Sequence, residues 1–287
     1  MVYVVRSPGS CGEFIQGYRN GNSYMVTCPV NRYAEAKTGF SGQGDTLPEK
    51  ADKARELTLS FLGKQDEKIP VKLHSCIQKS KGMASSTADI SAVAKAVSLA
   101  CAKPVSNRDI AEISLAIEPS DATFFHGITL FDYRHGKVIQ ELGNAPAMNL
   151  LIYDCGGEID TLQFNSRNDL LRLQQENEGV TTKALSLFMK GIEKQSLDLI
   201  GKAATISAFA NQRILYKPQL PYFWKIGKKA GGKGVICAHS GTVLGLILPM
   251  SVNPDTIRAY LDESLDGRMT WLDTVQVTNL GMTVEEI

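Results

Sequence analysis

Apolar and polar residues alternate along several short stretches of the chain, and elsewhere apolar residues recur every three or four positions. Alternation predicts strands, and the longer period predicts helices with one buried face. Strands are predicted at 1–6, 24–30, 31–40, 71–77, 128–131, 138–142 and 148–154, in two runs within 234–248, and at 274–278. Helices are predicted at 48–63, 90–101 and 106–117, several times between 166 and 231, and from 255 onward.

The order of these elements indicates the fold class and the division of the chain into domains. Strands separated by helices and by a hairpin at 128–142 favour an α+β sandwich. The polar, proline-containing stretch 143–146 is a plausible boundary. A chain of 287 residues suits two modest domains, which we place at 1–145 and 146–287.

Composition narrows the class of protein. Hydrophobic residues make up 43% and charged residues 21%, as is typical of a soluble globular enzyme. The formal net charge of +1 creates no long-range field for nucleic acid or an anionic membrane, so neither is expected as a partner. No apolar stretch is long enough to cross a bilayer and the first residues carry no basic leader, so we expect a cytoplasmic protein.

The cysteines and histidines point away from disulfides and structural zinc. The six cysteines include no C-x-x-C pair and mostly lie in apolar segments, which indicates reduced thiols. The four histidines show no metal-binding spacing such as H-E-x-x-H.

The stretch 79–89 joins a predicted strand to a predicted helix. Gly82 tolerates unusual backbone angles, and the small residues after it allow a ligand to reach the main chain. Ser86 and Asp89 have the spacing of a capping box, so a helix should begin here with free N–H groups that attract phosphate. The lysines Lys79 and Lys81 would add positive charge. An ordinary capped turn is the alternative.

Three further segments contain candidate functional residues, and each also has an ordinary structural explanation. The glycine-rich stretch 7–17 predicts a wide turn between strands, and 238–245 predicts a tight hairpin. Glu118 and Asp121 follow a predicted helix, where solvated acids are common. A carboxylate is nevertheless poorly placed at a helix C-terminus, so a cation near it is expected.

Taken in order, these strings resemble a known family. P-G-S-C-G-E-x-x-Q-G, G-M-A-S-S-T-A-D and A-H-S-G-T-V-L-G are similar to the three motifs of the GHMP kinases, in particular to the bacterial L-threonine kinases of the cobalamin pathway. The resemblance implies the two-domain GHMP architecture, with a ribosomal protein S5 domain 2-like N-terminal domain and a ferredoxin-like C-terminal domain. It covers nearly the whole chain.

The resemblance also implies roles for individual residues. Ser86 and Glu118 would hold Mg²⁺, and Asp121 would either deprotonate or orient the acceptor hydroxyl. The residues implied in binding the ATP phosphates are Lys79, Ser80, Lys81, Gly82, Met83, Ala84, Ser85, Ser86, Thr87, Ala88, Ser240, Gly241 and Thr242. The residues implied in the acceptor pocket are Ser10, Cys11, Gly12, Glu13, Gln16 and Asp121.

The expected activity is ATP-dependent phosphorylation of L-threonine to O-phospho-L-threonine, for the aminopropanol linker of cobalamin. Homoserine or another small alcohol as acceptor, and a catalytically silent binding protein, are the alternatives. Two departures from the family pattern matter: Ser10 and Cys11 stand where relatives often have a basic residue, and Gln78 stands where proline is common. The cation that neutralises the transferring phosphate is therefore left open, as is a homodimer.

Overall fold

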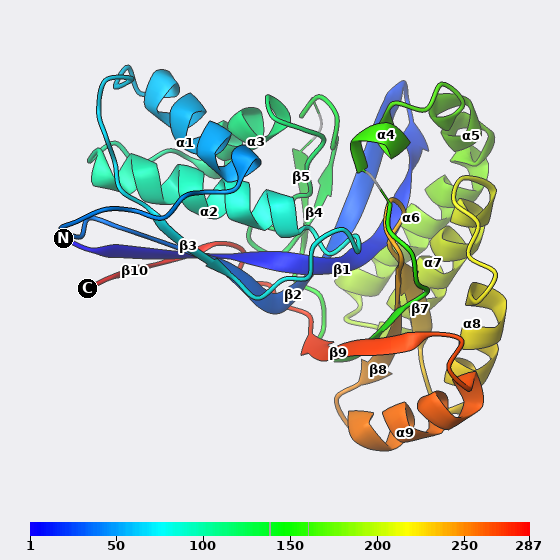
Figure 1. Cartoon of the computed structure of the whole chain (residues 1–287). Helices are drawn as coiled ribbons and strands as arrows, with labels where there is room; N and C mark the ends of the chain where they lie inside the picture. The colour runs from blue at the N-terminus through cyan, green and yellow to red at the C-terminus, as the bar shows by residue number, and fades with distance from the viewer. Residues whose placement is uncertain (138, 160) are drawn as a thin grey trace.

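The strands of the chain form a single large sheet with helices packed against it. The computed structural model describes residues 1–137, 139–159 and 161–287. Within these residues ten strands share one sheet, in the order β5-β4-β2-β1-β7-β8-β6-β9, with β10 paired to β1 and β3 paired to β2. Figure 1 shows the long strand β1 passing through the middle of the molecule.

The first two strands make a long antiparallel hairpin. β1 (Tyr3–Arg19) and β2 (Asn22–Thr38) meet at a two-residue turn, Asn20 and Gly21, both with positive φ. Two consecutive positive φ angles match the right-handed twist of the strands and close the hairpin tightly.

The predicted wide turn at 7–17 is wrong, because this stretch lies inside β1. Its proline and glycines are absorbed by register shifts between Pro8 and Gly9, between Ser10 and Glu13, and between Glu13 and Ile15. Such bulges let a strand bend without ending. The strands predicted at 24–30 and 31–40 are likewise one strand, β2.

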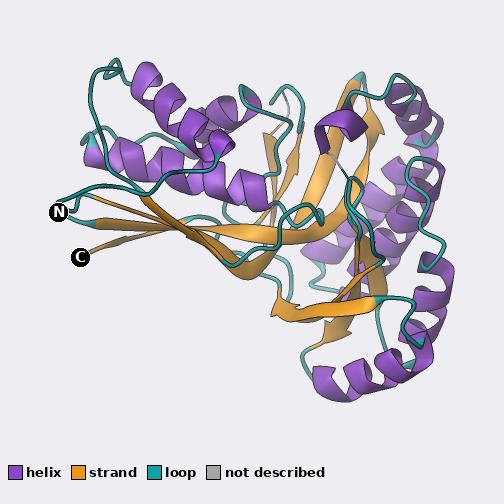
Figure 2. Ribbon diagram, viewed as in Figure 1, coloured by secondary structure: helices purple, strands orange, loops and turns teal. Residues whose placement is uncertain are grey.

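Three helices cover one face of this hairpin. They are α1 (Glu49–Phe61), α2 (Ser85–Ala100) and α3 (Asn107–Leu115), close to their predicted positions, with β3 (Lys72–Ser75) beside β2. α2 is buried along most of its length and packs on β1 and β2. A capping box begins α3, since Ser106 and Asp109 bond reciprocally. Figure 2 shows these helices above the strands.

The second half of the chain adds strands and a layer of helices beyond β1. The strands are β6 (Met148–Asp154), β7 (Gly234–Cys237), β8 (Val243–Pro249) and β9 (Thr270–Gln276). The helices are α4 (Thr161–Asn165), α5 (Leu170–Glu176), α6 (Glu178–Glu193), α7 (Leu197–Ala210), η1 (Asn211–Arg213), α8 (Leu220–Lys229) and α9 (Pro254–Leu265). α6 and α7 pack against β1, and α7 also packs against β7.

Two antiparallel hairpins match their predictions. β4 (Ile128–Phe131) pairs with β5 (Ile139–Gly143), although position 138 of the predicted strand lies outside the described residues. β7 pairs with β8 across the segment 238–242. The last strand, β10 (Thr283–Glu286), was not predicted; it runs antiparallel to the start of β1 and brings the two ends of the chain together (Figure 1).

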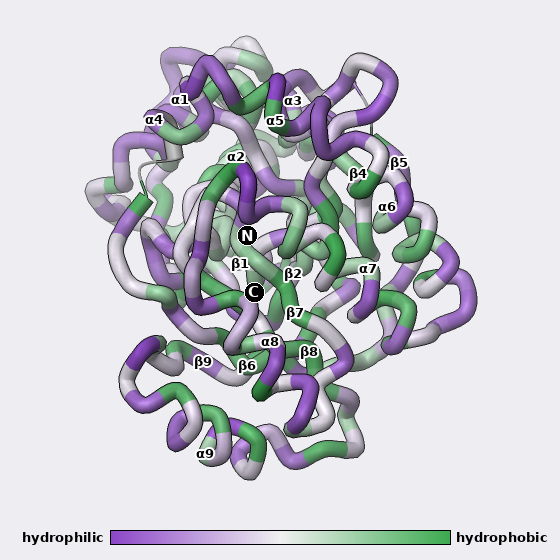
Figure 3. Tube along the Cα trace, turned by 90° about the vertical axis from the view of Figure 1, so that its right-hand side faces the viewer, coloured by the Kyte–Doolittle hydropathy of each residue, from purple (hydrophilic) through white to green (hydrophobic). Residues whose placement is uncertain are grey.

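One apolar core runs through both halves of the chain. It contains Phe14 of β1, Ala88 of α2, Ile152 of β6 and Phe188 of α6. Figure 3 shows hydrophobic segments along the central strands and hydrophilic ones on the outer loops. The division into domains 1–145 and 146–287 stays a prediction, because the shared sheet and core do not test it.

Candidate active site

A cavity of about 570 Å³ opens where the start of α1, the start of α2 and the middle of β1 meet. The segment 79–87 forms much of its wall, and Ser240 comes from the turn between β7 and β8. Its lining residues are Glu13, Pro48, Glu49, Lys50, Ala51, Lys79, Ser80, Gly82, Met83, Ala84, Ser85, Ser86, Thr87, Asp89, Glu118, Pro119, Asp121, Glu158, Ile159 and Ser240.

The loop before α2 has a left-handed backbone at every second residue. Ser80, Gly82 and Ala84 have φ of 60°, 82° and 55°, all in the left-handed region. For Ser80 and Ala84 this conformation costs energy, and such strain is typical of ligand-binding segments. Alternating left- and right-handed residues create concave N–H cradles for anions. The geometry suits a phosphate group at the N-terminus of α2.

The predicted capping box at Ser86 and Asp89 is wrong. α2 begins at Ser85 with Ala84 as its N-cap, and no side chain caps it. The reason is that the Ser86 hydroxyl donates instead to Glu118. The first N–H groups of the helix thus keep no capping side chain and remain directed at the cavity end.

The turn between β7 and β8 lies directly against this loop. Thr242 donates its backbone N–H to the Lys81 carbonyl at 3.0 Å. A Cβ on Gly82 would stand 2.9 Å from the Gly241 Cα, and one on Gly241 would stand 2.4 Å from the Gly82 Cα. Two glycines are needed here because the backbones touch. The second and third motifs are thereby joined.

Ser86, Glu118 and Lys50 form a chain of contacts in the cavity. The Glu118 carboxylate, only 4% exposed, accepts from the Ser86 hydroxyl through Oε1 and from Lys50 Nζ through Oε2 at 2.5 Å. The cation expected near Glu118 is therefore a lysine from α1. A buried carboxylate requires such partners, because an unpaired charge out of water is costly.

Asp121 lies three residues after Glu118 and lines the same cavity. Its Oδ1 accepts a hydrogen bond from the Thr27 hydroxyl at 3.1 Å, and its backbone N–H donates to the Thr87 hydroxyl at 3.2 Å. Burial, with further repulsion from Glu13, raises the pKa of Asp121 to about 7. A carboxyl group with this pKa can exchange a proton near neutral pH.

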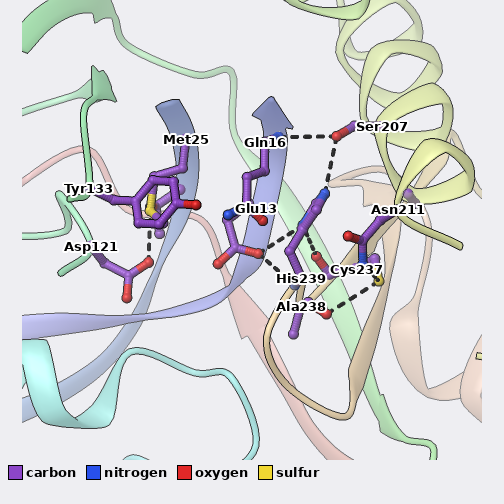
Figure 4. Close-up of polar contacts among 12 residues, drawn as sticks. Glu13, Gln16, Met25, Asp121, Tyr133, Ser207, Asn211, Cys237, Ala238 and His239 are labelled. Atoms are coloured by element: carbon purple, nitrogen blue, oxygen red, sulfur yellow. Dashed lines mark hydrogen bonds and ion pairs between the residues drawn. The ribbon is translucent and has the colours of Figure 1, made fainter. Parts of the chain in front are cut away.

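Glu13 and His239 connect the first motif to the third. Glu13 Oε2 accepts the His239 backbone N–H at 2.9 Å and lies 2.9 Å from His239 Nδ1. Nδ1 also lies 2.8 Å from the Cys237 carbonyl. Since both neighbours are acceptors, Nδ1 carries a proton and donates it. Figure 4 shows Glu13 and His239 pointing toward each other between β1 and the β7–β8 turn, with Ser207 on the far side of the ring.

Several predicted site residues do not line this cavity. Cys11 is buried and packs against Gly245, Ala88 is buried in the core, and Lys81 pairs with Asp154 at 2.7 Å. The others outside the lining are Ser10, Gly12, Gln16, Gly241 and Thr242. Ser10 and Gly12 act through the backbone: Ser10 donates to the Met83 carbonyl at 2.9 Å, and a Cβ on Gly12 would meet Ala238 N at 2.6 Å. Their roles in binding stay predictions.

Sequence reasoning missed two contributors. Lys50 sits in an ordinary amphipathic helix, and Glu158 sits in the loop after β6. Lys50 did carry a signal, because a lysine in the first turn of a helix is repelled by the helix dipole. Glu158 carried none.

The charge in the cavity fits a divalent cation. Acids outnumber lysines in the lining, which contains Glu13, Glu49, Asp89, Glu118, Asp121 and Glu158 against Lys50 and Lys79. A triphosphate entering such a site needs further positive charge. The described residues contain no cluster of three or more histidine, cysteine, aspartate or glutamate side chains able to hold a metal. The oxygen pair Ser86 and Glu118 fits Mg²⁺, which takes few protein ligands and completes its shell with phosphate and water.

Comparison with known proteins shows the family of this chain. A family model described as the GHMP kinases N terminal domain matches residues 50–127. An L-threonine kinase of Salmonella typhimurium is 32% identical over 253 residues, which span 86% of this chain and 83% of the relative. This chain belongs to the GHMP kinases.

Further relatives place the GHMP kinase fold on the whole chain. An L-threonine kinase of Citrobacter freundii is 30% identical, covering 85% of this chain and 86% of its own length. A solved homoserine kinase from Cytophaga hutchinsonii superposes with a TM-score of 0.68 at 15% identity, covering 99% of this chain and 97% of its own. At that identity the likeness concerns the fold, and it confirms the predicted α+β GHMP architecture.

Membership makes this protein a small-molecule kinase, which confirms the predicted enzyme class. That the loop before α2 binds the nucleotide stays a prediction. Among the described residues, no helix has the length and apolar character needed to span a membrane.

Proposed function

We propose that this GHMP kinase transfers the γ-phosphoryl group of ATP to the hydroxyl of L-threonine, giving O-phospho-L-threonine and ADP. The acceptor is supported by two relatives named L-threonine kinase that align with 85% or more of the chain. The reaction is supported by one structural observation: the phosphate-type loop, the Ser86–Glu118 pair and Asp121 share one cavity.

The nucleotide side of the site consists of the loop 79–87 and the Ser240 turn. Outward N–H groups and the start of α2 would hold phosphate oxygens, with Lys79 adding charge. Ser86 and Glu118 would hold Mg²⁺, whose contribution is to neutralise the phosphate charge. Phosphoryl transfer asks the protein mainly for alignment and charge stabilisation.

The acceptor side consists of Asp121 and Glu13. Asp121, with its raised pKa, would accept a hydrogen bond or the proton from the threonine hydroxyl. Glu13 lines the same cavity, and His239 fixes its carboxylate through two contacts at Oε2. A fixed carboxylate suits the ammonium group of an amino acid.

We further propose that the product serves the aminopropanol linker of cobalamin, as the motif resemblance implies. Six free cysteines suit the reducing cytoplasm, where we place the protein. A homodimer stays a prediction. Homoserine remains the second candidate acceptor, and the homoserine kinase likeness at 15% identity supports it through the fold alone.

The experiment is a measurement of ADP formation with L-threonine, for the native chain and for Ser86→Ala and Glu118→Gln. Each variant should lose at least about a hundredfold in kcat, because each removes charge stabilisation of the transferring phosphate. Ser60→Ala, at an exposed serine outside the cavity, is the control and should retain full rate. Unchanged rates in both site variants would rule out the assigned roles.

A further inference from the structure

Lys50 reaches the cavity from the first turn of α1 and contacts the buried acid Glu118. Its Nζ lies 2.5 Å from Glu118 Oε2, across 68 positions of sequence. Glu118 is almost fully buried, with 4% of its side chain exposed, whereas 39% of the Lys50 side chain is exposed. The carboxylate is therefore fixed, and the lysine has room to move.

The position of Lys50 is unfavourable for the helix that carries it. The N-terminus of a helix bears partial positive charge, which repels a lysine in the first turn and favours acids such as Glu49 and Asp52. Pro48, the N-cap, gives no side-chain bond. Helix stability thus gives no reason for this lysine.

Another cation near the site, Lys81, is held elsewhere. Lys81 pairs with Asp154 at 2.7 Å and donates to the Gly157 carbonyl at 3.0 Å. Among the described residues, the lysines that line the cavity are Lys50 and Lys79, and Lys50 is the one in contact with Glu118.

We infer that Lys50 is a catalytic residue that exchanges partners: it neutralises Glu118 in the metal-free protein, and it would contact the transferring phosphoryl group once Glu118 serves as a metal ligand. The inference rests on the proposed function. A buried carboxylate that awaits a metal needs a temporary cation. A displaced ammonium group then lies where negative charge develops in the transition state.

The chemical balance leaves Lys50 unchanged. The bond between the γ-phosphorus and its bridging oxygen breaks to release ADP, and a bond forms from that phosphorus to the acceptor oxygen. The acceptor proton leaves to Asp121 or to solvent. Lys50 keeps its protons and contributes charge alone.

The exchange predicts opposite effects of one substitution on two measurements. In Lys50→Met, Mn²⁺ as a probe should bind about two- to fivefold more tightly in the presence of ADP, because its competitor for Glu118 is gone and ADP offers no γ-phosphate. With ATP and acceptor, kcat should fall about a hundredfold, because the transition state loses a cation. Electron paramagnetic resonance measures the first quantity and ADP release the second.

Two further variants complete the test. Lys50→Arg keeps the charge. Its kcat and its Mn²⁺ affinity should therefore both lie close to those of the native chain. Lys53→Met, at an exposed lysine on the same helix and outside the cavity, should match the native chain in both measurements. Thermal unfolding of each variant checks that the fold is kept.

The outcomes separate this inference from the proposed function. If Lys50 only supports the position of Glu118, Lys50→Met would weaken Mn²⁺ binding or leave it unchanged, and the inference is overturned. Full kcat in Lys50→Met overturns it equally. If L-threonine is not the acceptor, the tighter Mn²⁺ binding is still expected, since that measurement uses no acceptor.

Discussion

Asp121 has its unusual acidity because the fold buries it beside another acid. Burial and the nearby charge of Glu13 raise its pKa to about 7, and the hydrogen bond from Thr27 opposes them only in part. The sequence predicted Asp121 as a site residue but did not predict its raised pKa. The pKa is raised first by burial and then by Glu13, which lies 108 positions earlier in the chain and approaches Asp121 only in the folded protein.

The first prediction concerns the pH dependence of the rate. Asp121 must be ionised to accept a hydrogen bond or a proton from the hydroxyl, so kcat/KM should rise with pH up to about 7 and then level off. Asp121→Asn should lose about a hundredfold or more in kcat and lose this rise. A pH–rate profile from pH 5 to 9 measures it, and a flat native profile between pH 6 and 8 would contradict it.

The raised pKa of Asp121 should also affect stability: the rate rises with pH, whereas the free energy of unfolding falls. Because the folded pKa lies above the usual 3.8, the native state binds the proton more tightly, and the free energy of unfolding falls as pH rises from about 4 to 7. Asp121→Asn removes this loss. Relative to the native chain, the variant should therefore gain about 1 kcal/mol or more between pH 5 and pH 8. Urea unfolding at both pH values measures the difference, and equal differences at the two values would contradict it.

At the scale of elements, the loop before α2 and the β7–β8 turn, the two segments proposed to bind the nucleotide, are in direct contact. Gly82 and Gly241 leave no room for a side chain on either side. The sequence indicated both turns separately, because glycine is a local signal. Their contact depends on the placement of distant elements, and no local pattern contains it.

This contact predicts a specific effect for Gly82→Ala. The new Cβ would stand 2.6 Å from the Ala238 Cβ, on a backbone with φ of +82°. We expect a loss of about 1–3 kcal/mol in unfolding free energy and at least about tenfold weaker ATP binding. Calorimetry measures both.

Gly21→Ala is the matched control. Gly21 has φ of +84° in the β1–β2 turn with nothing within 4 Å of an added Cβ. Gly21→Ala should lower the unfolding free energy only by the cost of the strained backbone, and it should leave ATP affinity unchanged. Equal effects of the two substitutions on ATP binding would mean that the contact is not needed.

The stretch 7–17 shows why a turn was predicted where the structure has the strand β1. Proline and three glycines are typical of a turn, yet the long pairing with β2 keeps the strand continuous through its bulges. Pairing over the whole hairpin outweighs local propensity. The amphipathic and apolar helices α1, α2 and α3 were predicted well because their periodicity is local.

At the scale of the whole molecule, the site exists because the sheet brings together segments from both ends of the chain. Glu13 and His239 are 226 positions apart and share a direct bond. The order of the three motifs and the α+β class could be predicted from the sequence. The contact made by Lys50 and the strand β10 could not, because their partners, Glu118 and β1, are fixed only by the folded chain.

The most direct test of the account is identification of the product by phosphorus NMR after incubation with ATP, Mg²⁺ and L-threonine. The account predicts O-phospho-L-threonine and ADP in equal amounts, with homoserine and other small alcohols reacting more slowly. Absence of phosphothreonine, or preferential phosphorylation of another alcohol under the same conditions, would contradict it.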